Sequence, residues 1–143
     1  MNRTMLRAKI HRIAVTQCDV AYEGSLTLDP GLMERADLVP YEKVDVYDVD
    51  NANRFATYLI EGERGSGECC VNGAAAHLVD VGNLLILASY TTVQQGDVAG
   101  HRPKVVLVGE GNRVKTVKEH EAAGVRVEAR VDQAPRNSRS KSL

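Results

Sequence analysis

Apolar residues recur at every second position in several short segments of the chain, and this period predicts β-strands rather than helices. The first such segment is 9–16, where the alternation places the basic residues Lys9 and His11 on the apolar face of the strand. That face also carries Ile13 and Val15. A lysine near a strand end usually extends its amine into solvent, so a lysine on an apolar face is a candidate for a specific role.

Turn-forming residues and apolar runs indicate the other strands. The polar segment 50–53 predicts a turn, so 44–49 and 54–60 are expected to pair as a hairpin. The runs 84–90 and 105–108 are continuously apolar, which is typical of strands buried on both faces.

One short helix is predicted among these strands. Asp29 is suited to cap its N-terminus, and Pro30 fits the first helical position because no backbone N–H is needed there. A short apolar stripe follows and ends near Pro40. Many short strands, brief turns and so little helix together indicate a compact β-barrel.

The composition is that of a folded chain with an aliphatic core. Of its 143 residues, 43% are hydrophobic and 26% are charged, with one phenylalanine and no tryptophan. This length fits a single domain. The net charge of −1 gives no reason to expect a nucleic-acid partner, so an acidic substrate would need a local pocket.

The cysteines and glycines exclude several kinds of site. The adjacent pair Cys69 and Cys70, with one further cysteine, forms neither a disulfide framework nor a CxxC zinc motif, so no metal is expected. Free cysteines indicate a reducing compartment, and the N-terminus lacks the apolar stretch of a signal peptide, so we expect a cytoplasmic protein. The Gly-rich segment 62–67 lacks the Lys-Ser/Thr ending of a P-loop, which leaves phosphate binding without support.

The pattern weakens toward the C-terminus. Alternation over 125–131 permits one late strand, and the polar segment 133–143 carries cations but no acid. We expect that segment to be a disordered tail, with 116–143 as an extension of a domain formed by 1–115.

The strongest candidate for chemistry is the pair Gly24-Ser25. By itself a glycine followed by a serine is ordinarily a turn, because glycine adopts positive φ easily and serine bonds nearby backbone groups. The motifs around it are less ordinary: YEGS at 22–25, RFATY at 54–58 and NGAAAH at 72–77. Together they resemble the pyruvoyl-dependent aspartate 1-decarboxylase family.

This resemblance covers about residues 1–108 and implies a fold, an activity and a cofactor. Family members adopt a six-stranded double-psi β-barrel and form homotetramers with sites between subunits. They convert L-aspartate to β-alanine and CO2 for pantothenate synthesis. The chain is then a proenzyme that cleaves itself between Gly24 and Ser25, and Ser25 becomes the covalent pyruvoyl group that binds the substrate amine as a Schiff base. The resemblance leaves open whether a maturation factor assists the cleavage.

The resemblance also assigns roles to single residues. Tyr58 is the proton donor, since a phenol with a pKa of about 10 stays protonated at neutral pH. Thr57 orients the Gly24 carbonyl during self-cleavage. Lys9 and Arg54 hold the substrate carboxylates, because arginine binds a carboxylate through a planar fork and lysine acts as a point charge. The residues implied for substrate binding are Lys9, Arg54, Thr57, Asn72, Gly73, Ala74 and Ala75.

An ideal strand over 54–60 sets a geometric condition on this site. Arg54 and Tyr58 share one face about 13 Å apart at 3.3 Å per residue, while Thr57 points to the other face. All three roles are met only if the long side chains lean toward one another or a bulge lies at Thr57.

Two other interpretations fit parts of the sequence. If the chain is a small β-barrel binding module without chemistry, Gly24-Ser25 is only a turn and Arg54 a solvated surface residue. The same fold could also act on a different amino acid, although two cations favour a dicarboxylate. His11 and His77 match the family pattern but are equally well explained as structural hydrogen-bonding residues.

Overall fold

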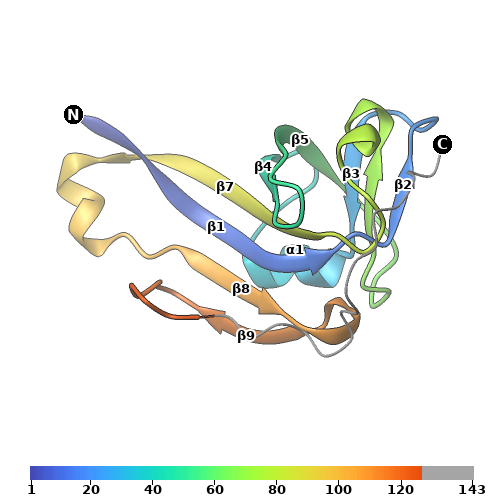
Figure 1. Cartoon of the computed structure of the whole chain (residues 1–143). Coiled ribbons are helices and arrows are strands. Elements are labelled where there is room, and N and C mark those ends of the chain that lie inside the picture. Colours follow the sequence, from blue (N-terminus) through green and yellow to red (C-terminus); the bar gives the residue numbers. More distant parts are fainter. Residues whose placement is uncertain (127–143) are drawn as a thin grey trace.

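Nine strands and four short helices make up residues 1–126, the part of the chain that the computed structural model describes (Figure 1). The prediction of a mainly β protein with short helices is confirmed. The strands are β1 (Asn2–Ala14), β2 (Gln17–Asp19), β3 (Ser25–Leu28), β4 (Lys43–Asp48), β5 (Arg54–Glu61), β6 (Cys69–Asn72), β7 (Leu84–Gln94), β8 (Lys104–Val108) and β9 (Val114–Lys118). The helices are α1 (Pro30–Ala36) and the 3-10 helices η1 (Gly73–Leu78), η2 (Gln95–Gly100) and η3 (Glu110–Asn112).

All nine strands belong to one sheet, in the order β2-β6-β3-β5-β4-β7-β1-β8-β9. The long strands β1 and β7 run antiparallel over most of their length, and Figure 1 shows them extending together away from α1. Three pairs are parallel: β1 with β8, β2 with β6, and β3 with β5. Within residues 1–126 no pairing joins β2 to β9, so the sheet is open at these two edges.

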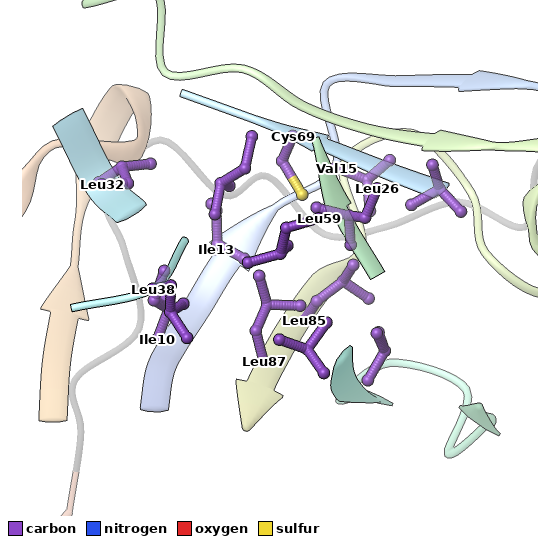
Figure 2. Packing of buried hydrophobic residues seen from close by; sticks show 14 of the residues in the cluster. Ile10, Ile13, Val15, Leu26, Leu32, Leu38, Leu59, Cys69, Leu85 and Leu87 are labelled. Carbon is purple, nitrogen blue, oxygen red and sulfur yellow. The ribbon is translucent and has the colours of Figure 1, made fainter. Parts of the chain in front are cut away.

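The core is aliphatic, as the scarcity of aromatic residues predicts. Figure 2 shows side chains from β1, β3, β5 and β7 meeting in one cluster. Ile10, Ile13, Leu26, Leu59 and Leu87 are all fully buried in it. Burying one such side chain contributes roughly 1.5–3 kcal/mol, so the cluster determines which face of each strand points inward.

Most of the strands predicted from turns and apolar runs are confirmed. The hairpin pairs β4 with β5, from Lys43 opposite Tyr58 to Tyr47 opposite Arg54. The apolar run 84–90 begins β7, and the run 105–108 lies within β8.

The end of the chain differs from the sequence-based expectation in one strand. β9 was not predicted, because its apolar residues Val114 and Val117 are three positions apart and do not follow the period of two. Apart from residues 125 and 126, the strand predicted over 125–131 lies outside the described residues, as does the tail at 133–143. The boundary at residue 115 stays a prediction.

The start of α1 forms as the sequence predicts. Asp29 caps the helix by accepting a hydrogen bond from the Gly31 N–H at 2.8 Å, and Pro30 is the first helical residue. The helix ends at Ala36, before the predicted end near Pro40, because the next residue adopts a left-handed conformation with a φ of 57°.

The Asp29 carboxylate also holds the Gly-rich segment 62–67. It accepts hydrogen bonds from the backbone N–H groups of Gly67 at 2.9 Å and Gly65 at 3.1 Å. Burial opposes the charge, but the backbone donors of Gly67, Gly31 and Gly65 outweigh it and keep the pKa of Asp29 below its usual value. The Asp29 carboxylate therefore fixes the position of this segment through hydrogen bonds to its backbone.

A bulge in β1 corrects one prediction about strand faces. Arg12 has a φ of 68°, and the register with β7 shifts between His11 and Ile13. Because the extra residue reverses the alternation, Ile13 comes to the buried face that Ile10 occupies, and Lys9 and His11 point to the other side. The prediction that Lys9 and His11 share a face with Ile13 and Val15 was therefore wrong.

Candidate active site

Gly24 and Ser25 lie where a loop enters β3. Gly24 is exposed, and no atom beyond its chain neighbours lies within 4 Å of the position that a Cβ would take. Ser25 is the first residue of the strand and only 3% exposed. The bond between them lies outside the strand pairings. Breaking it therefore leaves β1 paired with β7 and β2 paired with β6 before the cut, and β3 paired with β5 and β6 after it.

The register of β3 with its two neighbours determines which side chains surround Ser25. Leu26 lies opposite Leu59 of β5, and both are buried in the core. One residue earlier on each strand are Ser25 and Tyr58, which therefore point away from that core on strands roughly 4.8 Å apart. On the other side of β3, Ser25 lies opposite Asn72 of β6.

We call this side of β6, β3 and β5 the Ser25 face. It carries Ser25 and Thr27 from β3, Cys70 and Asn72 from β6, and Arg54 and Tyr58 from β5. Four residues predicted from the sequence are thus on one face of three neighbouring strands. Arg54 is four positions before Tyr58, so it lies further along the face.

The Asn72 side chain connects β6 to β3 at this face. Its amide nitrogen donates hydrogen bonds to Ser25 Oγ at 3.1 Å and to Thr27 Oγ1 at 2.9 Å. Its amide oxygen accepts a hydrogen bond from Cys70 Sγ at 3.1 Å. Asn72 is 2% exposed, and both polar atoms of its side chain have hydrogen-bond partners inside the protein.

The turn after Asn72 is packed against the cleavage site. Gly73 has a φ of 70°, and a Cβ built on it would lie 2.7 Å from the Cα of Gly24. Only glycine allows both this conformation and this approach. Ala74 and Ala75 follow in η1, Ala74 exposed and Ala75 half-buried.

Tyr58 and Arg54 each lie beside another tyrosine. The rings of Tyr58 and Tyr41 are stacked with their centroids 6.4 Å apart, and Tyr58 is 41% exposed. The Arg54 guanidinium lies 4.3 Å from the centroid of the Tyr47 ring. A hydrogen bond with Tyr90, helped by burial, raises the pKa of Tyr47 to about 12, so this ring stays neutral under the cation.

Thr57 lies on the opposite side of β5. It is paired with Val44, which is buried, and it is half-buried itself. It lies two residues before Leu59, the β5 partner of Leu26, and so near the point where the chain enters β3. The β4–β5 pairing runs through Thr57 without a register shift, so the bulge considered there is absent from this hairpin.

Lys9 is not among the residues of the Ser25 face. β1 is separated from β5 by β7 and β4 in the sheet, and Lys9 forms an ion pair with Glu121. This pair lies in a cavity of about 310 Å³ that His11, Arg12 and Lys118 also line. Within one chain the two predicted substrate cations are therefore at different places.

The two histidines of the family pattern also occupy separate places. Burial lowers the pKa of His11 to about 4, and the nearby charges of Lys9 and Arg12 act in the same direction. Its imidazole is therefore neutral at pH 7 beside Lys9. His77 is exposed in η1.

Cys70, Thr27 and Tyr47 belong to this site but were not predicted. Cys70 was considered only for disulfides and zinc, and nothing in the sequence shows which way its thiol points. Thr27 and Tyr47 have no signature of their own in the sequence. Each belongs to the site through a contact with a residue of another strand, Thr27 with Asn72 and Tyr47 with Arg54.

Residues 1–126 contain no group of three or more histidine, cysteine, aspartate or glutamate residues that could hold a metal ion. None of the helices in that range has both the length and the apolar character needed to cross a bilayer.

Comparison with known proteins matches the chain to one family. The family model described as aspartate decarboxylase matches residues 1–115. Aspartate 1-decarboxylase of Ralstonia pickettii is 53% identical over 119 residues, which cover 83% of this chain and 99% of that protein. Aspartate 1-decarboxylase of Syntrophus aciditrophicus is 53% identical over 80% of this chain and 99% of its own length, and that of Legionella pneumophila strain Lens is 51% identical over 81% and 87%.

Proposed function

The chain belongs to the aspartate decarboxylase family, and from this membership we propose which of its residues carry out the reaction. The protein is a carboxy-lyase that converts L-aspartate to β-alanine and CO2 for pantothenate synthesis. The alternatives of a binding module without chemistry and of a different amino acid as substrate are thereby set aside.

The cofactor is a covalent pyruvoyl group derived from a serine of the chain, and we assign that serine to Ser25. The observation that best supports this assignment is that the Gly24-Ser25 bond joins an exposed loop to the buried first residue of β3. A new chain end at position 25 would be held by β5 and β6, while Gly24 lies in the loop outside these pairings. Once formed, the group supplies a carbonyl that binds the substrate amine and accepts the electron pair released with CO2.

Self-cleavage requires the chain's own atoms and one water. Ser25 Oγ attacks the Gly24 carbonyl carbon, forming a C–O bond as the C–N bond breaks, and the hydroxyl proton passes to the released nitrogen. Loss of the Ser25 Hα with the Gly24 carboxylate, then hydrolysis with release of ammonia, gives Met1–Gly24 and a longer chain that begins with the pyruvoyl group. Thr57 lies two residues before the β5 partner of Leu26, near the entry of the chain into β3, and this position supports its role in orienting that carbonyl.

The substrate carboxylates are bound by Arg54 and Lys9 in this proposal. The exposed position of Arg54 on the Ser25 face supports its part. Lys9 would come from a neighbouring subunit, since β4 and β7 separate the two strands within one chain. Asn72, Gly73, Ala74 and Ala75 form a turn beside Ser25 whose small residues allow backbone N–H groups to approach a carboxylate.

Tyr58 delivers the proton that replaces CO2 on carbon. Its strand position beside Ser25, on the same face, supports this role. Its hydroxyl takes part in no hydrogen bond with the rest of the described chain, so its proton is not committed elsewhere. Positioned phenols of this kind act as general acids.

We further propose a homotetramer with sites between subunits. Tyr22, Tyr41 and Tyr58 are 57%, 79% and 41% exposed, and such aromatic surface is typical of an interface. The sites then combine the Ser25 face of one subunit with Lys9 of the next.

The remaining proposals concern architecture and location. We propose the six-stranded double-psi β-barrel for the catalytic domain, 1–115, supported by the parallel pairs β1–β8 and β3–β5, which join strands distant in sequence. Residues 116–143 are the extension. We place the enzyme in the cytoplasm and propose that a maturation factor could assist its cleavage. Mass spectrometry of the purified chain tests the assignment of Ser25, with two fragments separated between Gly24 and Ser25 as the expected result.

A further inference from the structure

The adjacent residues Cys69 and Cys70 are both buried in β6 but face opposite sides of the sheet. Cys69 is 0% exposed and belongs to the hydrophobic core cluster. Cys70 is 2% exposed but lies on the Ser25 face, where its Sγ is 3.1 Å from Asn72 Oδ1. The two cysteines therefore have different environments despite being neighbours in the sequence.

The contact with Cys70 limits how the Asn72 side chain can be oriented. A primary amide has one oxygen that accepts and one nitrogen that donates two hydrogen bonds. Here the nitrogen donates to Ser25 Oγ and Thr27 Oγ1, and the oxygen faces a thiol. Burial raises the pKa of Cys70 to about 11, and Glu68 adds to this, so the thiol keeps its hydrogen at neutral pH and can donate it to the amide oxygen.

This orientation matters for Ser25. Because Ser25 Oγ accepts from Asn72, its own hydrogen is left available for transfer when the oxygen attacks Gly24. The same N–H would stabilise the negative charge that develops on Oγ as that hydrogen leaves. If the amide rotated by half a turn, its oxygen would face Ser25 and accept the hydroxyl hydrogen instead.

We propose that Cys70 is a positioning residue for self-cleavage, whose thiol holds the Asn72 amide with its nitrogen toward Ser25 Oγ. This inference rests on the proposed function, in which Ser25 Oγ attacks the Gly24 carbonyl. Cys70 contacts neither Gly24 nor the substrate in this account, and it acts through Asn72 alone.

Three substitutions separate the hydrogen bond from packing. Cys70→Val fills the site with a branched side chain that has no donor, Cys70→Ala removes both volume and donor, and Cys70→Ser keeps a donor. Cys69→Ala is the matched control, because it empties a similar volume one residue away on the core side. The rate at which full-length proenzyme converts to two chains is followed by intact mass, with any maturation factor present in all samples, and the Tm of each variant is recorded.

We expect Cys70→Val and Cys70→Ala to cleave about 5-fold more slowly than the parent and Cys70→Ser to cleave within about 2-fold of it, since a neutral hydrogen bond is worth roughly 1 kcal/mol. Cys69→Ala should have a lower Tm but the parent's cleavage rate. The inference is overturned if Cys70→Val cleaves like the parent, or if Cys70→Ser is as slow as Cys70→Val. Should Cys70→Ala fail to fold, the valine and serine variants still decide the question. A parent chain that never cleaves, or a Ser25→Ala variant that does, would overturn the proposed function instead.

Discussion

A Cβ atom on Gly73 would lie 2.7 Å from the Cα of Gly24, which places the turn after β6 in direct contact with the backbone of the cleavage site. The same Cβ would lie 2.9 Å from the Gly24 nitrogen. Both neighbours are backbone atoms, so no side-chain movement could relieve the contact. The position of Gly24 relative to Ser25 therefore depends on the absence of a side chain at residue 73.

Replacing Gly73 by alanine should displace Gly24 and slow self-cleavage by at least about 10-fold, because small misplacements of reacting atoms carry large costs in rate. Gly65→Ala is the matched control: Gly65 has a similar φ of 81° but open space around it. Both variants suffer the backbone strain of a left-handed alanine, roughly 1–2 kcal/mol. Equal cleavage rates for the two, measured by intact mass, would show that the contact with Gly24 is irrelevant.

Arg54→Ala should lower kcat/KM for aspartate by roughly 10- to 150-fold, the equivalent of a charged hydrogen bond of about 1.5–3 kcal/mol. Self-cleavage should be unchanged, because Arg54 has no part in it. Arg102→Ala serves as control, since Arg102 is an exposed arginine that donates to the backbone oxygens of Ala99 and His101. Steady-state kinetics that match the parent for Arg54→Ala would make it a surface residue and remove one support for dicarboxylate binding.

Glu121→Gln should lower the KM for aspartate about 2- to 5-fold, since exposed ion pairs contribute up to about 1 kcal/mol. The reason is that Glu121 occupies the Lys9 amine that is proposed to bind a substrate carboxylate. Glu119→Gln changes the same charge nearby and should leave KM at the parent value. The difference between the two variants should shrink as salt is added. An identical KM for both would mean that Lys9 does not bind the substrate or is not blocked by Glu121.

Tyr58→Phe should reduce turnover by about 10²–10⁴, the usual effect of removing a positioned general acid. Chain cleavage should proceed normally, and borohydride should still attach the substrate covalently to the long chain. Tyr90→Phe is the control for losing a tyrosine hydroxyl, because Tyr90 has a similar exposure of 42% and lies on β7. Its partner Tyr47 lies under Arg54, so any effect of this variant should appear in KM rather than in turnover. Full turnover in Tyr58→Phe would assign the proton to another group, and failed cleavage in a folded variant would move Tyr58 into maturation.

Local features of this fold could be predicted from the sequence because their causes are local. The cap at Asp29 followed by Pro30 and the turn at 50–53 depend on residues within a few positions of each other. The apolar run 84–90 forms a strand that is mostly buried up to Ser89 because of its composition, although Tyr90 at its end is exposed. The bulge at Arg12 could not be predicted, because an arginine at positive φ is held there by the pairing with β7 and has no signature of its own.

The candidate site was predictable only in part for a similar reason. Ser25, Tyr58 and Asn72 were found through motifs, but their placement on one face depends on β3 pairing with two strands that lie far along the chain. Cys70 contacts Asn72 two residues along the same strand, but only the register of β6 with β3 places both residues beside Ser25 and Thr27. For Lys9, the structure of one chain shows a different neighbour, Glu121, from the one that the motif implied.

The central claim, that Ser25 supplies the cofactor, is tested most directly by intact-mass spectrometry of the purified parent and of Ser25→Ala. For the parent we expect two species, Met1–Gly24 and a longer chain lighter by the mass of one ammonia than the same chain beginning with serine. Ser25→Ala should give only the full-length mass, even after long warm incubation with any maturation factor present, and should show no decarboxylation. A parent chain that remains whole under those conditions, or an active Ser25→Ala variant, would contradict the account.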